Sequence, residues 1–392
     1  MYKNIYLKRG KDSSILRFHP WIFSGAIAGM EKGIAEGDTV RVLDSENRFL
    51  AVGHFQVGSI AVRILSFQDV ELDENFLESR LQSAIDMRLN LNLVREDNTA
   101  FRLVHGEGDG LPALIVDVYG RTAVIQAHSI GMHLWRKTIA AVLHKLMSDR
   151  LDCIYYKSDQ TLPLNVDMDS ESGYLYGKEK TDVALENGLQ FHIDWLKGQK
   201  TGFFIDQRDN RSLLKAFSEN KKVLNMFCYT GGFSVYALQG GAQLVHSVDS
   251  SARAVELTDA NVALNFSGTT KHQSFACDAF KFLSDMTEDY DVVILDPPAF
   301  AKHRQAIHNA LKGYIRLNEA ALAKIKPGGV VFTFSCSQAI TPEQFRQAVF
   351  TAAARCNRFV RILHQLHQPA DHPINIYHPE GEYLKGLVLY VE

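Results

Sequence analysis

Hydrophobic and polar positions follow one pattern before about residue 186 and a different one after it. The first part opens with short apolar runs separated by polar turns, and it predicts strands at 39–43, 49–52 and 60–65. Short strands joined by turns at this spacing are typical of a small β-barrel. An acidic stretch at 71–74 then marks a boundary. We therefore expect a barrel domain over residues 1–72.

The next stretch mixes the helical and strand periods. Apolar residues from Phe76 to Leu89 recur at helical spacing and predict a helix from 76 to about 93. Glycines at 106–110 lack the Lys-Ser/Thr of a phosphate loop and lead into a strand, so they predict a tight turn. Together these features indicate a small α+β domain over residues 73–185. Its other predicted elements are strands at 101–104, 113–117, 122–126, 154–156 and 183–185 and a helix at 135–147.

From residue 186 onward, apolar strands alternate with helical segments, as in a doubly wound α/β sheet. The last two strands lie close together along the chain, with no long helical pattern between them, which predicts an antiparallel pair. We expect a Rossmann-like domain over 186–392, with a mixed sheet and an antiparallel last strand. The predicted strands are 222–227, 244–248, 272–276, 291–295, 330–334, 359–363 and 387–391.

Composition narrows the class of protein. The 392 residues are 46% hydrophobic and 22% charged, as in a globular protein, and no apolar run could cross a bilayer. The amino terminus lacks the apolar core of a signal peptide. Five cysteines without a CxxC pair indicate reduced thiols in the cytoplasm; neither a disulfide framework nor a metal site is expected.

The net charge of −3 neither requires nor excludes a nucleic-acid partner, because a local basic surface is enough to bind phosphate. The amino-terminal segment offers such a surface, with Lys8 and Arg9 at its centre. An ordinary solvated charged face is the alternative interpretation.

Two predicted strand ends carry the most informative residues of the chain. Asp296 follows the strand at 291–295, and Cys336 follows the strand at 330–334. Ligands of open α/β sheets bind outside the carboxyl ends of the strands, so both residues should face one crevice. A carboxylate beside a thiol there suggests covalent chemistry on a planar, electron-poor ring.

A second group of residues predicts a nucleoside cofactor. The strand at 222–227 runs into Gly231, where the backbone can approach a ligand near free amide groups of a helix start. Asp249 ends the next strand, where a carboxylate can accept two ribose hydroxyls, and Asp278 follows the third, near an adenine edge. Each aspartate could instead cap a helix. Gly231, Asp249 and Asp278 follow three successive strands, which indicates a nucleoside site. Because the chain has no dinucleotide-binding loop here, we expect the nucleoside to be S-adenosylmethionine.

With that cofactor, Cys336 and Asp296 suggest methylation of a cytosine. A thiolate that attacks C6 turns the ring into an enamine-like species whose C5 can take a methyl group. Asp296 would hold the base edge, and Phe300 could stack on the ring. A buried, inert cysteine and a structural Asp-Pro turn are the alternatives.

Nearly the whole chain resembles a known family, the PUA-domain-containing cytosine-C5 methyltransferases of large-subunit ribosomal RNA. The similar motifs are HPWIFSG at 19–25, GQKTGFFIDQRDNR at 198–211, FCYTGGFS at 227–234, DPPAF at 296–300, SCS at 335–337, ADHPI at 370–374 and EGEYLKG at 380–386.

The resemblance implies an amino-terminal RNA-binding PUA barrel, a central α/β domain and a class I methyltransferase domain. It implies that Cys336 is the nucleophile and Asp296 its partner. The pocket for S-adenosylmethionine would be lined by Phe227, Tyr229, Thr230, Gly231, Asp249, Asp278 and Asp296.

The segment from Lys200 to Arg211 could cover the cofactor and grip RNA phosphate through Lys200 and Arg208. A structural hairpin held by an Arg208–Asp206 pair is the alternative. Large-subunit ribosomal RNA is the expected partner, no membrane is expected, and a second copy of the chain is a further candidate partner.

Two other functions stay open from the sequence. A methyltransferase that acts on a base nitrogen would also use an acidic-Pro-Pro-aromatic strand end, and Cys336 would then be a bystander. A non-catalytic RNA-binding or ribosome-assembly protein would need neither Cys336 nor the cofactor.

Overall fold

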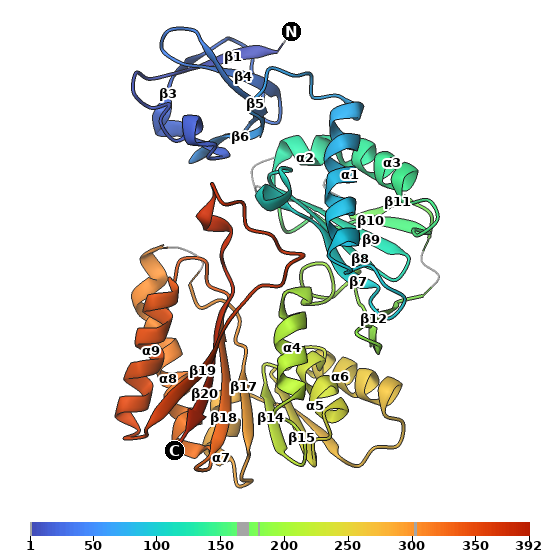
Figure 1. The fold of residues 1–392 in the computed structure, drawn as a ribbon, viewed down its shortest axis with the longest axis vertical. Coiled ribbons are helices and arrows are strands. Elements are labelled where there is room, and N and C mark those ends of the chain that lie inside the picture. Colours follow the sequence, from blue (N-terminus) through green and yellow to red (C-terminus); the bar gives the residue numbers. More distant parts are fainter. Residues whose placement is uncertain (1, 163–171, 179–180, 302–303) are drawn as a thin grey trace. The chain divides into compact units, whose positions relative to one another are not determined.

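The computed structural model describes residues 2–162, 172–178, 181–301 and 304–392, and the chain forms two compact units (Figure 1). The first unit comprises residues 1–185, 193–203 and 370–381, and the second comprises 186–192, 204–369 and 382–392. The carboxy-terminal part of the chain therefore leaves the second unit at Ala370 and returns to it at Glu382. No helix in the described ranges is both long and apolar enough to cross a membrane.

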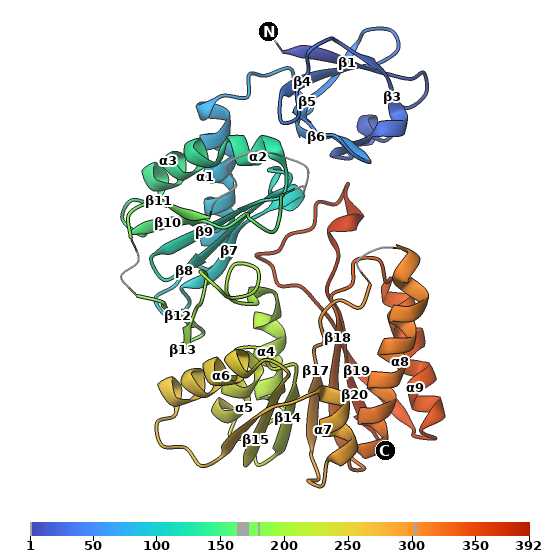
Figure 2. The same ribbon diagram turned by 180° about the vertical axis from the view of Figure 1, so that it is seen from behind.

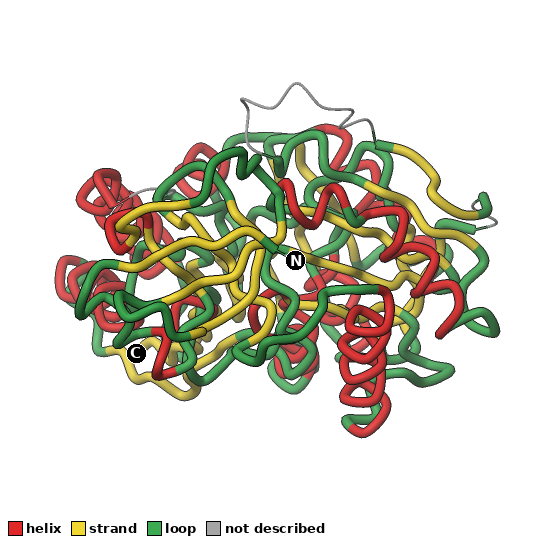
Figure 3. The backbone as a smooth tube through the Cα atoms, turned by 90° about the horizontal axis from the view of Figure 1, so that it is seen from above, coloured by secondary structure: helices red, strands yellow, loops and turns green. Residues whose placement is uncertain are grey.

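The amino-terminal part of the first unit is a six-stranded sheet in the order β2-β6-β5-β4-β1-β3. β1 pairs with β4 in parallel, and the other pairs are antiparallel. Within residues 2–66, loops and 3₁₀ turns connect the strands, without an α-helix (Figure 3). The strands are β1 (Lys3–Leu7), β2 (Trp21–Phe23), β3 (Ile27–Met30), β4 (Thr39–Leu43), β5 (Phe49–Phe55) and β6 (Ile60–Ser66), with turns η1 (Ile15–Arg17) and η2 (Ser24–Ala26).

The rest of the first unit is a five-stranded sheet in the order β11-β10-β9-β8-β7, packed against α1 (Glu74–Asn90) and α3 (Arg136–Leu146). The glycine-rich segment 106–110 is a turn, as predicted, and contains η3 (Gly106–Asp109). The remaining elements are β7 (Ala100–His105), β8 (Leu114–Tyr119), β9 (Thr122–Ala127), α2 (Ile130–Leu134), β10 (Cys153–Tyr156) and β11 (Gly173–Tyr176). A short two-stranded sheet, β12 (Val183–Glu186) with β13 (Leu189–His192), follows.

The second unit is built on a seven-stranded sheet in the order β16-β15-β14-β17-β18-β20-β19. The first five strands are parallel, and β20 runs antiparallel to both neighbours, which confirms the predicted mixed sheet. The strands are β14 (Lys222–Met226), β15 (Leu244–Asp249), β16 (His272–Ala276), β17 (Val292–Leu295), β18 (Gly329–Ser335), β19 (Val360–His367) and β20 (Lys385–Val391).

Helices cover both faces of this sheet (Figures 1 and 2). One face packs against α7, α8 and α9 and the other against α4 and α5, so the central strands are buried on both sides. The helices and 3₁₀ turns of this unit are η4 (Ile205–Gln207), α4 (Arg208–Lys215), α5 (Gly232–Gln239), α6 (Ala252–Asn265), α7 (Ala279–Asp285), η5 (Arg304–Ala306), α8 (Ile307–Lys324) and α9 (Pro342–Arg355). The turn η6 (Pro379–Gly381) belongs to the segment 370–381 of the first unit.

Local sequence explains where several helices begin. Thr341 and Gln344 form a reciprocal capping box at the start of α9, with Pro342 at its first position. Ser251 caps α6 and Asp278 caps α7, each by accepting a backbone N–H with its side chain. These caps fix the points at which the chain turns from a strand end into a helix.

Candidate active site

The two strand ends predicted from the sequence lie side by side in the second unit. β17 and β18 pair in parallel, with Leu295 opposite Thr333, so Asp296 and Cys336 follow neighbouring strands at the same edge. The Sγ atom of Cys336 lies 4.0 Å from the carbonyl oxygen of Pro297, the residue after Asp296. Cys336 is partly buried and carries a reduced thiol. The arrangement brings a thiol and a carboxylate to one edge of the sheet.

Tyr314 of α8 braces the segment around Cys336. The hydroxyl of Ser335 donates to the Tyr314 hydroxyl at 2.9 Å, and Tyr314 also shares a hydrogen bond with the Ser337 hydroxyl at 2.9 Å. The backbone N–H of Ala301 donates to the same Ser337 hydroxyl. Burial raises the pKa of Tyr314, so its phenol stays neutral. Both neighbours of the cysteine are therefore fixed by one buried phenol.

Lys385 of β20 approaches the same segment from the antiparallel neighbour of β18. It is 7% exposed, pairs in register with Ser335, and donates from Nζ to the carbonyl oxygens of Ser337 and Ile340, each at 2.7 Å. Burial lowers the pKa of Lys385 to about 8, and the charge of Cys336 opposes this shift. At neutral pH the lysine is still an ammonium ion. Its positive charge interacts electrostatically with the Cys336 thiol.

Phe300 occupies the turn after Asp296, where it packs on Tyr314 with the ring centroids 4.7 Å apart. A Cβ atom on Gly313 would lie 2.9 Å from the Phe300 ring, so the glycine leaves room for this packing. The ring is partly buried. The packing against Tyr314 fixes the turn, and part of the Phe300 ring remains accessible.

The loop from β14 to α5 has an unusual backbone. Phe227 (φ 58°) and Tyr229 (φ 47°) are left-handed although neither is glycine, and Gly231 (φ 79°) follows. Phe227 was expected to end the strand, but β14 ends at Met226 because the chain turns here. Strained conformations of this kind cluster at ligand-binding loops. A Cβ on Gly231 would lie 2.6 Å from Cγ2 of Thr258, so the glycine also allows α6 to pack closely.

The other predicted pocket residues surround this loop. The carboxylate of Asp249 accepts from the backbone N–H groups of Tyr229 at 3.1 Å and Ser251 at 2.9 Å. Thr230 is buried, and its carbonyl accepts from the side chain of Asn261. Asp278 is exposed and caps α7 through the N–H of Lys281. Asp249 therefore joins two loops, whereas Asp278 has the helix-capping contact that was the alternative interpretation.

The predicted RNA-contacting residues divide between the two units. Lys8, Arg9 and Lys200 are exposed residues of the first unit. Arg208 begins α4 in the second unit and is only 2% exposed, with its Nε atom 3.8 Å from Asp209. Asp206 accepts a hydrogen bond from the hydroxyl of Tyr383 at 2.7 Å. Because it is buried, Arg208 does not offer the surface guanidinium that we expected for phosphate.

Two residues of the site, Tyr314 and Lys385, were not singled out from the sequence. Lys385 lies inside the motif at 380–386, so its position was visible but its partners were not. Tyr314 is one aromatic residue on an apolar helix face, and no motif marks it. Both contact the residues on either side of Cys336, and these contacts join segments that are distant along the chain.

Comparison with known proteins identifies the family of this chain. Residues 160–381 match the S-adenosylmethionine-dependent methyltransferase family model, and residues 5–67 match a PUA-like domain. The chain belongs to this methyltransferase family. It is 39% identical to the ribosomal RNA large subunit methyltransferase I of Aeromonas hydrophila, over 99% of each chain, and 36% identical to that of Klebsiella pneumoniae, over 100% of this chain and 99% of the relative.

Solved structures share the fold of this methyltransferase. A methyltransferase from Streptococcus mutans aligns over 99% of each chain with a TM-score of 0.84 at 24% identity. A methyltransferase structure that contains S-adenosylhomocysteine aligns over the same share with a TM-score of 0.85. These structures confirm the class I fold, and the family matches confirm the amino-terminal PUA-like domain and the predicted dependence on S-adenosylmethionine.

The residues present suit that cofactor. Two backbone N–H groups orient the Asp249 carboxylate at the end of β15, where oxygen acceptors suit the hydroxyls of a ribose. The left-handed loop brings the main chain to the amino terminus of α5, which begins at Gly232. Asn225 stands at the end of β14, where its amide donates to Ser234 at 2.9 Å. The loop thus provides a polar cradle made largely of backbone.

Proposed function

We propose that this methyltransferase transfers a methyl group to C5 of a cytosine in large-subunit ribosomal RNA through a covalent adduct with Cys336. The observation that carries the proposal is the pair of neighbouring strand ends, with the Cys336 thiol 4.0 Å from the turn that carries Asp296. A thiol has no evident part in methylation of a base nitrogen, whose lone pair attacks directly. It has a defined part in methylation at C5, which is a poor nucleophile until C6 is attacked.

Cys336 takes part in the first and the last step of the proposed reaction. The thiolate of Cys336 bonds to C6, and the electrons of the C5–C6 double bond make C5 nucleophilic. When bound, S-adenosylmethionine supplies the methyl group on a sulfonium, and the S–CH₃ bond breaks as C5 takes the methyl. A base then removes the C5 proton, the double bond re-forms, and Cys336 leaves as a thiolate.

Three neighbouring groups support these steps. The Asp296 carboxylate can accept a hydrogen bond from the exocyclic amine of cytosine and hold the base edge in position for attack. The Lys385 ammonium, fixed by two backbone carbonyls, favours the thiolate both before attack and on departure. Tyr314 fixes the serines on either side of the cysteine. Positioning of this kind is a large part of the work of an enzyme.

The cofactor contacts belong to the same proposal. Phe227, Tyr229, Thr230 and Gly231 would line the pocket through the loop after β14, with Asp249 on the ribose and Asp278 near the adenine edge. Asp296 would then lie between cofactor and base. The left-handed loop and the orientation of Asp249 support this assignment.

The RNA part of the proposal is supported by the first unit and by the relatives. The PUA-like domain presents exposed Lys8 and Arg9, and Lys200 is a further exposed cation of this unit. Such side chains can bind phosphates without reading sequence. The relatives, similar over nearly their full length, are named as ribosomal RNA large-subunit methyltransferases. Phe300 would contact the target base from the catalytic turn.

Trapping on a modified RNA tests the covalent step. Ribosomal RNA that contains 5-fluorocytosine has no C5 proton to lose, so the methylated adduct should stall as a complex that survives denaturing electrophoresis. The wild-type enzyme should form it with S-adenosylmethionine, and Cys336→Ala should not. Cys356→Ala is the matched control, because Cys356 is a partly buried thiol of the same unit that donates to the carbonyl of Glu319.

Bisulfite sequencing of the product RNA locates the methyl group. We expect one or more protected cytosines with the wild type and the control variant, and none with Cys336→Ala. Full methylation by Cys336→Ala, or a product methylated on a base nitrogen, would refute the covalent C5 mechanism. Cofactor affinity, measured by calorimetry, should be nearly the same in all three proteins.

A further inference from the structure

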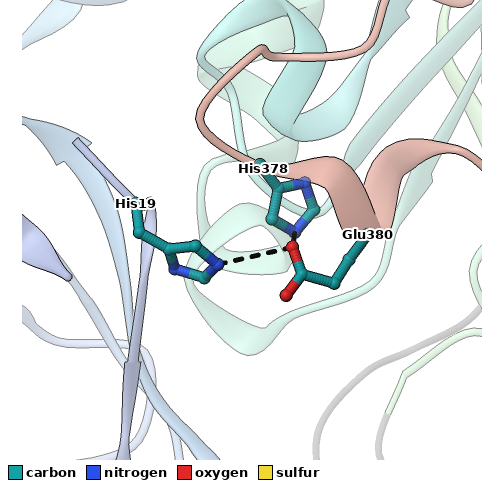
Figure 4. A group of neighbouring side chains, drawn as sticks. All are labelled: His19, His378 and Glu380. Atoms are coloured by element: carbon teal, nitrogen blue, oxygen red, sulfur yellow. Dashed lines mark hydrogen bonds and ion pairs between the residues drawn. The ribbon is translucent and has the colours of Figure 1, made fainter. Parts of the chain in front are cut away.

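Three side chains of the first unit converge outside the methyltransferase sheet (Figure 4). His19 precedes β2 of the PUA-like domain, and His378 and Glu380 lie in the segment 370–381. The Oε2 atom of Glu380 is 3.4 Å from Nε2 of His19 and 3.8 Å from Nε2 of His378. One potential ligand atom from each residue lies within 4.8 Å of the other two. Two imidazoles and a carboxylate are a common set of zinc ligands.

His378 is the most informative member of this cluster. It is 3% exposed, and neither of its ring nitrogens has a hydrogen-bond partner among the residues that the structure describes. The ring packs against Trp21, with the centroids 4.3 Å apart, and its Nε2 faces the Glu380 carboxylate (Figure 4). A buried polar group without a hydrogen bond costs about 1–3 kcal/mol, so such groups in folded proteins usually have a further partner. A metal ion at Nε2 would provide that partner.

His19 is prepared to be a second ligand. Its Nδ1 atom lies 3.3 Å from the carbonyl oxygen of Trp21 and 3.2 Å from the Trp21 backbone N–H. An unprotonated Nδ1 accepts from the Trp21 N–H, whereas the tautomer with a proton on Nδ1 donates to the Trp21 carbonyl and leaves the lone pair of Nε2 available to a metal ion. Histidine ligands of metals are commonly oriented by such a bond from the other ring nitrogen. A metal ion would select this tautomer.

The neighbouring charges do not compete for the ion. The carboxylate of Glu107 accepts from Trp21 Nε1 at 2.7 Å and forms an ion pair with Arg63 at 3.0 Å. The Glu380 side chain is 43% exposed, which leaves a path for an ion to enter and a place for a water ligand.

We propose that His19, His378 and Glu380 bind a divalent transition-metal ion, with Zn²⁺ the best match, and that the ion joins the PUA-like domain to the segment 370–381. A tetrahedral Zn²⁺ with bonds of about 2.0–2.1 Å separates its ligand atoms by about 3.3 Å. The two distances of 3.4 and 3.8 Å need only small side-chain rotations to reach this value. The site is independent of the proposed reaction, because no residue of the strand-end site takes part in it.

Metal titration of the full-length protein tests the site directly. The purified protein, stripped with a chelator, is titrated with Zn²⁺ in a calorimeter and with Co²⁺ in a spectrophotometer. We expect one ion per chain and the visible absorption of a four-coordinate Co²⁺ with nitrogen and oxygen ligands. His378→Gln and Glu380→Gln should each weaken binding at least about tenfold, since loss of a ligand costs no less than loss of a supporting contact. Glu380→Gln is the safer variant for folding, because the side chain is partly exposed.

Two controls separate this site from other metal-binding groups. His364→Gln removes an exposed imidazole of β19 in the second unit and should leave binding unchanged. Cys336→Ala should also bind one ion, without thiolate charge-transfer absorption in either protein. Bound Zn²⁺ should slow proteolysis of the segment 370–381 in the wild type but not in Glu380→Gln. The proposal would be overturned if the wild type did not bind the ion, or if His378→Gln and Glu380→Gln bound it as tightly as the wild type. Loss of binding in Cys336→Ala would also overturn it.

Discussion

In the second unit, the residues that follow the strands form two halves of the candidate site, a cofactor half and a catalytic half, and these are built in different ways. On the cofactor side, after β14 and β15, the main chain itself is unusual, with left-handed Phe227, Tyr229 and Gly231 in one loop. On the catalytic side, after β17 and β18, side chains from neighbouring elements contact the residues on either side of Cys336. The cofactor half therefore depends on backbone shape, and the catalytic half depends on a few buried polar groups.

This difference predicts different sensitivities to substitution. A backbone cradle should fail when a Cβ atom is added or a turn is strained, with a loss of cofactor affinity. A side-chain network should fail when one polar atom is removed, with a loss of turnover at nearly constant cofactor affinity. Variants that remove one feature at a time can test whether the two halves are separable.

Lys385→Met should have the largest effect on the catalytic half. Methionine keeps much of the buried volume but removes the ammonium whose charge interacts with Cys336, so the thiolate should be less favoured at neutral pH. Alkylation of Cys336 at pH 7 should slow about tenfold to a hundredfold, since the rate follows the thiolate fraction. Peptide mass spectrometry would measure this rate for Cys336 alone, and Lys324→Met, which removes an exposed lysine of α8, is the control.

The pH dependence of this effect has a definite sign. The pKa of Lys385 is lowered to about 8, so the wild type has the ammonium below that pH and loses it as the pH rises further. The difference between Lys385→Met and the wild type should therefore be largest near pH 7 and narrow above about pH 9. A purely structural loss, from the unpaired carbonyls of Ser337 and Ile340, would slow alkylation equally at every pH and would contradict the electrostatic role.

Gly231→Ala should have the largest effect on the cofactor half. The residue has φ 79°, and the new Cβ would lie 2.6 Å from Cγ2 of Thr258. The left-handed conformation costs an alanine about 1–2 kcal/mol, and the clash adds to this, so cofactor affinity should fall about tenfold or more. Calorimetric titration with S-adenosylhomocysteine would measure the loss.

Gly268→Ala is the matched control for this variant. Gly268 has a similar φ of 72° but no atom within 4 Å of the added Cβ, so it reports the backbone strain without the clash. Adding Thr258→Ser to Gly231→Ala removes the clashing methyl group and retains the hydroxyl that donates to the Tyr229 carbonyl. If cofactor affinity is unchanged in Gly231→Ala, or is not partly restored in the double variant, the backbone account of this half is wrong.

The same contrast explains which parts of the site the sequence could predict. Parallel strands place their carboxyl ends at one edge, so alternation of strands and helices was enough to bring Asp296 and Cys336 together. The contacts of Lys385 depend on the antiparallel register of β20 with β18, which no local pattern specifies. The left-handed conformations of Phe227 and Tyr229 have no compositional signal, because such residues usually avoid them.

Burial was the other property that the sequence did not predict. Arg208 looked like a phosphate ligand because it stands in a run of alternating charges, but it is buried at the start of α4. The proximity of His19 to Glu380, 361 positions apart in the sequence, could not be inferred from the cysteine spacing, on which the expectation of no metal site rested. Non-local packing decides both cases.

Among these variants, Tyr314→Phe should have the smallest effect on turnover. It tests whether a single hydroxyl of the catalytic half contributes to catalysis. It removes one hydroxyl and leaves those of Ser335 and Ser337 without their shared buried partner, at a cost in unfolding free energy of about 1–2 kcal/mol. Tyr290→Phe is its counterpart, because the buried Tyr290 hydroxyl bonds to His246 away from the catalytic strand ends. Both variants should lose similar stability in urea denaturation, but only Tyr314→Phe should lower kcat, by a few-fold, while cofactor affinity is unchanged in both. An equal effect on kcat would mean that loss of stability alone slows the enzyme; a lower kcat in Tyr314→Phe alone would mean that the phenol positions Cys336 for attack.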